Sequence, residues 1–119
     1  MITITTFIKE VIFLKNMDSE VVKATFGGDG LVNVVLSNNS PTGKVLIQTK
    51  PMHHGFSMDV MVHPDAGHDH KLLEDMEFFE TPEEALAGHA RAASKYDKNG
   101  SRYNPVLVGS VYRIVPTGL

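Results

Sequence analysis

The stretch TPEEALAGHARAASKY (residues 81–96) decides the fold class, because it is the one clear helical pattern in a chain rich in strand-forming residues. Thr81 is the expected N-cap, Pro82 fits the first helical position, and Glu84 stands three residues beyond the threonine. This S/T-x-x-E pattern is typical of a capping box, and the acidic first turn favours the positive end of the helix dipole. The pattern predicts a helix that begins directly after Thr81.

One face of this predicted helix carries an apolar stripe. Its members recur at i, i+3, i+4, i+7 and i+10, and they are Leu86, His89, Ala90, Ala93 and Tyr96. Because His89 lies on this stripe, we expect its ring to be buried and hydrogen-bonded to a neighbouring strand or loop. DKNG (residues 97–100) ends the pattern, with Gly100 available beyond the helix end. We therefore predict structural roles for His89, Thr81 and Glu84.

Segments rich in β-branched and aromatic residues surround the helix on both sides. They are residues 2–16, 20–26, 31–38, 44–50, 56–63 and 105–116. The sequence GGDG (residues 27–30) predicts a hairpin turn, because glycine adopts positive φ freely. In residues 56–63 every second side chain is apolar, which predicts that Phe56, Met58, Val60 and Val62 face the core. Residues 105–116 predict a final strand or strand pair, with Gly109 at a bulge or bend.

These elements predict an α+β fold with a mainly antiparallel β-sheet and one α-helix, at about residues 82–96, packed on one face. A chain of 119 residues is the size of one ordinary domain, and it contains no linker or internal repeat. We therefore expect a single α+β domain over residues 1–119.

Composition narrows the functional classes. The chain has no cysteine, which removes disulfides and thiolate sites, and no apolar run long enough to span a membrane or to act as a signal peptide. The net charge is −3 and the basic residues are scattered, so we expect no direct binding of nucleic acid. The acidic residues gather in one segment: Glu74, Asp75, Glu77, Glu80, Glu83 and Glu84. This segment fits a solvated helix start, or alternatively the contact of an acidic inhibitor of a nucleic-acid-binding protein.

Five of the six histidines lie in PMHHGFSMDVMVHPDAGHDH (residues 51–70). Histidine and carboxylate side chains bind several transition metals, and the candidate ligands are His53, His54, His63, His68, His70 and Glu74. HDHKLLE (residues 68–74) has the H-x-H-x-x-x-E spacing of the first cupin motif, but the flanking glycines and the later histidine of that motif are missing. A small metal-dependent enzyme that uses this cluster remains an alternative.

The same stretch contains groups suited to acid–base chemistry. His53, His54, Asp59 and His63 would converge if the strands on either side formed a hairpin about Gly55. The sequence offers no nucleophile elbow and no P-loop, and GGDG does not open a helix. We therefore expect no catalytic residue and no cofactor.

Residues 45–93 resemble a widespread group of small uncharacterised proteins from tailed bacteriophages, in which a strand pair and a loop precede an E-A-x-x-G-H helix. The residues that match this pattern are Phe79, Thr81, Glu84, Ala85, Gly88 and His89. MDVMV (residues 58–62) is similar to the second strand of the group, and His54 corresponds to a histidine in its turn. The resemblance implies a phage origin and an α+β fold, and it implies no enzymatic activity. PDAGHDHKLLEDME (residues 64–77) is a loop of this chain's own.

The sequence favours a non-enzymatic phage protein that acts through protein–protein contacts. We expect a virion component, or an accessory protein that binds a host factor, in the virion or in the host cell cytoplasm. Exposed strand edges also favour self-association, because they offer unpaired backbone groups to another chain.

Overall fold

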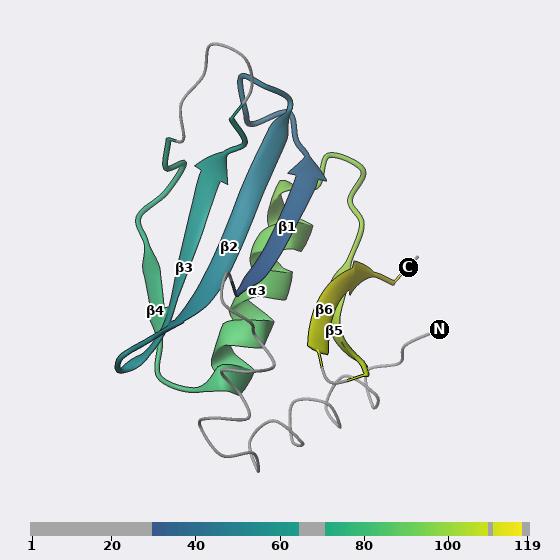
Figure 1. Ribbon diagram of the computed structural model, residues 1–119. Coiled ribbons are helices and arrows are strands. Elements are labelled where there is room, and N and C mark those ends of the chain that lie inside the picture. Colours follow the sequence, from purple (N-terminus) through teal and green to yellow (C-terminus); the bar gives the residue numbers. More distant parts are fainter. Residues whose placement is uncertain (1–29, 65–70, 110, 118–119) are drawn as a thin grey trace.

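The computed structural model describes residues 30–64, 71–109 and 111–117. In chain order its elements are β1 (Leu31–Leu36), β2 (Lys44–Met52), β3 (Gly55–Val62), β4 (Glu77–Phe79), α3 (Pro82–Tyr96), β5 (Tyr103–Val108) and β6 (Val111–Pro116). Strands β1 to β4 form an antiparallel sheet in that order, and β5 and β6 form a two-stranded antiparallel sheet. Helix α3 lies on one face of the four-stranded sheet, with the β5–β6 hairpin beside β1 (Figure 1). The α+β prediction is confirmed.

Several predicted features lie outside the described residues. They are the strand segments at residues 2–16 and 20–26, most of the GGDG turn, and the two histidines His68 and His70. Within the part of the chain that is described, β1 is an edge of the four-stranded sheet. No helix in this part is long and apolar enough to cross a membrane.

Helix α3 has the boundaries that its capping residues predict. The Thr81 hydroxyl accepts a hydrogen bond from the backbone N–H of Glu84 at 3.3 Å, and Pro82 occupies the first helical position. At the other end, Asp97 is the C-cap, and its carboxylate accepts a hydrogen bond from the backbone N–H of Asn99 at 2.8 Å. Gly100 follows with a φ of 70°. Local sequence chemistry therefore sets both ends of this helix.

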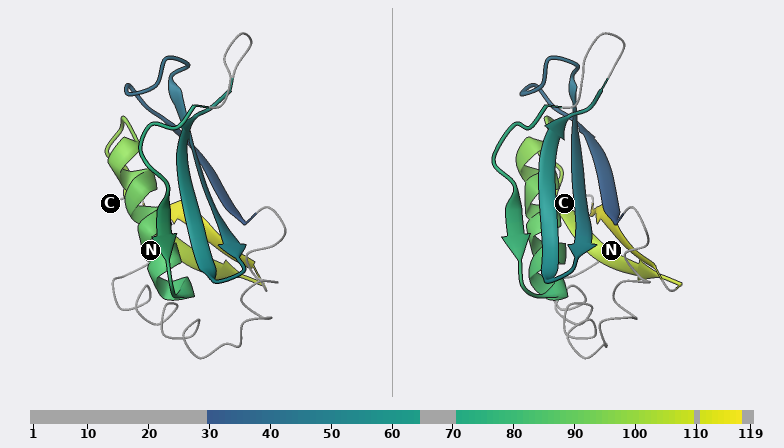
Figure 2. Two further views of the ribbon diagram at one scale, coloured as in Figure 1. Left: turned by 90° about the vertical axis from the view of Figure 1, so that its left-hand side faces the viewer. Right: turned by 60° about the vertical axis from the view of Figure 1, so that its left-hand side comes forward.

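The core lies between α3 and one face of the sheet, as the side views show (Figure 2). Period-two alternation selects the strand residues that enter it, which include Val35, Val45, Ile47, Phe56, Met58, Val60 and Val62. The predicted stripe of α3 is buried throughout, and Ala85, Gly88 and Ala92 widen it. A Cβ atom on Gly88 would lie 2.3 Å from the Phe79 ring, so only glycine admits that ring. Close packing of helix on sheet thus depends on small residues.

Two strand features go beyond the prediction from sequence. Strand β4 is not expected from the sequence; it begins at Glu77, the last residue of the predicted loop, and it extends the sheet through the pairs Phe56↔Phe79 and Met58↔Glu77. Residues 105–116 supply most of a strand pair, in which Gly109, with a φ of 65°, lies at the turn. This pair forms its own sheet beside β1 instead of extending the main one.

Candidate functional site

The histidine-rich stretch is divided by the hairpin that it forms. His53 and His54 are exposed in the β2–β3 turn, with their ring centroids 4.4 Å apart, whereas His63 follows the far end of β3. Eight strand residues at about 3.3 Å each separate these two ends by roughly 25 Å. Asp59 lies between them, opposite Gln48. The hairpin about Gly55 therefore exists, but the prediction that these four side chains converge is wrong, because the length of β3 holds its two ends apart.

Glu74, the carboxylate among the metal candidates, is engaged elsewhere. It accepts hydrogen bonds from the Tyr96 hydroxyl and the Lys95 ammonium at the end of α3. The bond from Tyr96 is the main reason why the pKa of Glu74 is lowered. Within residues 30–64, 71–109 and 111–117, no three histidine or carboxylate side chains form a metal-binding group. The described metal candidates are thus dispersed.

Part of the acidic segment is also neutralised by the helix. Lys95 pairs with Glu74 and Arg91 pairs with Glu77, each at 3.3 Å. Because these carboxylates already have cationic neighbours, less of the segment's charge is available to a basic partner. The acidic-inhibitor alternative gains no support from this arrangement.

His89 is fully buried, and both of its ring nitrogens are hydrogen-bonded, as its place on the stripe predicts. Nδ1 lies 2.8 Å from the Thr49 hydroxyl, and Nε2 lies 2.8 Å from Asn33 Oδ1. Since the Asn33 oxygen only accepts, Nε2 carries the proton and Nδ1 accepts from the threonine. The Asn33 amide in turn donates to the Ile114 carbonyl at 2.9 Å. This chain of bonds links α3 to β2, β1 and β6.

Protonation of His89 is unfavourable in the folded protein. Burial lowers the pKa of His89 to about 3, so the ring is neutral at physiological pH. A catalytic base must reach a substrate proton, whereas this side chain has no exposed surface. The geometry fits a structural residue that ties the helix to the sheet.

The residues of the FFETPEEALAGH segment (residues 78–89) have defined places in this packing. Phe79 packs on Gly88, Thr81 caps the helix at Glu84, Ala85 is fully buried, and His89 bonds to β1 and β2. Gly55, with a φ of 107°, lies so close to β4 that a Cβ atom there would approach the Phe79 carbonyl to 2.4 Å. The segment thus encodes how the helix docks on the sheet.

The face of the four-stranded sheet that points away from α3, which we call the open face, carries exposed apolar side chains that core packing does not explain. Its β1 side chains Val32, Val34 and Leu36 are 46–48% exposed, and Phe78 on β4 is 63% exposed. The strand register aligns Val34 with Leu46, Leu46 with Met61, and Met61 with Leu72. Paired residues share a face, so Val34, Leu46, Met61 and Leu72 form one apolar row across the sheet. Leu46 and Met61 are half-buried, and Leu72 is 47% exposed.

Polar side chains flank the apolar row on the same face. Alternation along β2 places Lys44, Gln48 and Lys50 there, and both lysines are exposed. Asp59 on β3 pairs with Gln48, next to the row. Its Oδ1 atom is buried and has no hydrogen-bond partner among the described residues. A buried carboxylate oxygen without a donor is costly, which makes this position the least satisfied on the open face.

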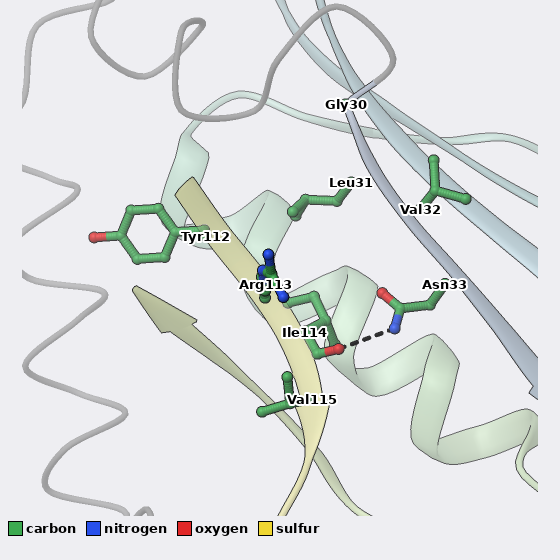
Figure 3. A pocket seen from close by; sticks show the side chains of 8 residues that line it. All are labelled: Gly30, Leu31, Val32, Asn33, Tyr112, Arg113, Ile114 and Val115. Atoms are coloured by element: carbon green, nitrogen blue, oxygen red, sulfur yellow. Dashed lines mark hydrogen bonds between the residues drawn. The ribbon is translucent and has the colours of Figure 1, made fainter. Parts of the chain in front are cut away.

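A crevice of about 380 Å³ separates β1 from β6 (Figure 3). It is lined by Gly30, Leu31, Val32, Asn33, Tyr112, Arg113, Ile114 and Val115. The hydrogen bond from Asn33 to Ile114 crosses it, and Arg113 is its one charged side chain. Tyr112 and Arg113 are the ionisable groups of the described lining, which contains no carboxylate and no histidine.

Sequence reasoning missed the apolar row, although one signal was present. In LVNVVL the inward residues Leu31 and Val35 and the outward residues Val32, Val34 and Leu36 are all apolar. A strand with one solvated face normally alternates apolar and polar side chains, so apolar residues on both faces indicate two contact surfaces. In comparisons with known proteins, no family model, curated protein or solved structure matches this chain.

Proposed function

We propose that this chain is a non-enzymatic protein of a tailed bacteriophage that acts through protein–protein contacts. It serves either as a virion component or as an accessory protein that binds a host factor, in the virion or in the host cytoplasm. The phage origin rests on the sequence resemblance over residues 45–93. The contact function rests on the apolar row and on the exposed valines beside it.

The size of the exposed patch supports a contact role. The strands have six, nine, eight and three residues; at about 3.3 Å per residue and 4.8 Å between strands, they give a face of about 400 Å², which includes the polar side chains. Contiguous apolar patches of a few hundred Å² on soluble proteins often mark interaction sites. The residues on which the resemblance rests are, by contrast, occupied with packing, whereas the exposed side chains of the open face add nothing to the described core.

A capture experiment with matched variants tests this proposal. Val34 on the open face and Val111 on the β5–β6 hairpin are 46% and 45% exposed, so Val34→Lys and Val111→Lys differ mainly in location. Immobilised wild-type chain and both variants are incubated with lysate of infected host cells, and the retained proteins are identified by mass spectrometry. We expect a defined protein that wild type and Val111→Lys retain and Val34→Lys loses. Identical retention by all three chains would contradict a contact at the open face.

Mass spectrometry of purified phage particles separates the two forms of the proposal. A virion component is present in a fixed number of copies per particle. An accessory protein is absent from particles and is found only in infected cells.

A further inference from the structure

We propose that the partner of the open face is a second copy of this chain, packed sheet against sheet in a two-fold dimer. This inference rests on the proposed contact function and names its occupant. Two features favour a second copy: the order of the apolar row, and the opposite charges of Lys50 and Asp59 beside it.

The apolar row is ordered so that it can pack on itself. A two-fold axis parallel to the strands and midway between β2 and β3 keeps every residue at its own height along the strands. It places β1 of one copy over β4 of the other, and β2 over β3. Val34 then faces Leu72 of the second copy, and Leu46 faces Met61. All four apolar side chains of each copy lose solvent contact together, as in aligned sheet packing.

The same operation brings opposite charges together. Gln48 and Asp59 form the adjacent row, so the axis places Gln48 of one copy over Asp59 of the other. Lys50 stands two residues, about 7 Å, further along β2, so its ammonium is within reach of the Asp59 carboxylate of the other copy. The two-fold axis repeats this pairing of Lys50 with Asp59, so each dimer contains it twice.

The area of the open face determines how tightly we expect two copies to bind. Two faces of about 400 Å² bury about 800 Å² in total, which is less than the roughly 1,000 Å² of a stable interface, so we expect a weak or transient complex. We therefore expect a dissociation constant in the micromolar range, on the order of 10 to 100 µM. Such a dimer forms only where the chain is locally concentrated.

Sedimentation equilibrium of the full chain, from about 5 to about 500 µM, tests the dimer. Wild type should shift from monomer to dimer across this range. Val34→Lys places a charge in the apolar row and should weaken the dimer at least about tenfold, whereas Val111→Lys should leave it unchanged. Thermal unfolding at low concentration verifies that each variant is folded.

A charge-exchange experiment tests the geometry. In a dimer of Lys50→Glu, the new carboxylate lies near Asp59 of the second copy; in a dimer of Asp59→Lys, the new ammonium lies near Lys50 of the second copy. Both contacts pair like charges, so each variant alone should dimerise at least about tenfold more weakly than wild type. Mixed in equal amounts, the two variants restore opposite charges at both contacts and should form a heterodimer close to wild-type strength.

Three results would overturn the second copy as partner: a monomer at the highest concentration, a dimer that Val34→Lys leaves intact, or a mixture that stays monomeric. A monomeric chain that still captures a protein lost by Val34→Lys rejects the dimer and retains the contact function. A chain that neither dimerises nor captures such a protein rejects both.

Discussion

The two faces of the four-stranded sheet are built from similar residues but meet different surroundings. On β1, Val35 points toward α3 and is 2% exposed, whereas its neighbour Val34 points away and is 46% exposed. The helix face is closed by small residues, a capped helix and a hydrogen-bonded histidine. The open face has the apolar row and, beside it, the Asp59 Oδ1 atom without a hydrogen-bond partner among the described residues. The apolar side chains of one face are buried under α3, whereas those of the other face remain partly exposed, and the proposed contact function rests on this difference.

The largest difference between the faces should appear on β2, where Ile47 and Leu46 point in opposite directions. Ile47 is fully buried, so Ile47→Ala should cost about 2–5 kcal/mol of unfolding free energy through lost burial and a cavity. Leu46→Ala should cost clearly less at low protein concentration, because its side chain is only half-buried. Urea unfolding measures both values. Equal losses of unfolding free energy for the two substitutions would mean that the open face is already buried in the monomer.

The next largest effect concerns His89. His89→Ala leaves the Thr49 hydroxyl and the Asn33 carbonyl without their buried partner, and should lower the unfolding free energy by about 1–3 kcal/mol. His54→Ala, in the exposed turn, should stay within about ±0.5 kcal/mol. If His89→Ala leaves the unfolding free energy unchanged and His54→Ala lowers it, the structural histidine is His54 in the turn and not His89 in the helix.

His89 also predicts how the helix face responds to acid. Its folded pKa of about 3 lies below its usual 6.5, so between these values the unfolded chain binds more protons. Stability should therefore fall as pH drops from 6.5 toward 3, by up to about 1.4 kcal/mol per pH unit from this residue. His89→Gln, which keeps a neutral hydrogen-bonding side chain, should flatten this slope. Parallel pH profiles for the two proteins would show that His89 is not buried in its neutral form.

A smaller effect is expected where the loop before β4 meets the helix. Tyr96→Phe removes the hydroxyl that donates to Glu74 and should cost about 0.5–1.5 kcal/mol. It should also raise the pKa of Glu74, because this hydrogen bond is the main cause of its lowered value. Denaturant unfolding and NMR titration of the Glu74 carboxyl carbon measure the two effects. An unchanged Glu74 pKa would contradict this contact.

The smallest effect should come from the open face itself. Val34→Ala should change the unfolding free energy of the monomer by no more than about 0.5 kcal/mol, since half of the side chain is already in water. Val35→Ala, one residue away, should cost about 1.5–3 kcal/mol. Equal values for the two substitutions would remove the distinction between the faces.

Features encoded locally were predictable from the sequence. The capping box and the stripe of α3 gave its boundaries, and alternation in β3 gave its core face, because both patterns arise from residues close in sequence. The burial of His89 followed from its helical position. Its partners Thr49 and Asn33 did not, since they lie 40 and 56 residues away.

Features that depend on strand pairing were not predictable. Strand β4 has three residues, too few for a period, and it is a strand because Phe79 pairs with Phe56. The apolar row exists because the register brings residues of three strands and a bridge onto one line. Along the sequence these residues are scattered over positions 34 to 72, so the surface emerges only in the folded sheet.

Amide NMR spectra recorded while the full chain is diluted from about 500 to about 10 µM test the central claim most directly. The account predicts chemical-shift changes that cluster on the open face, at Val34, Leu46, Asp59 and Met61, with none around His89 or in the His53–His54 turn. Shifts confined to the turn or to the β5–β6 hairpin, or spectra that do not change with concentration, would contradict it.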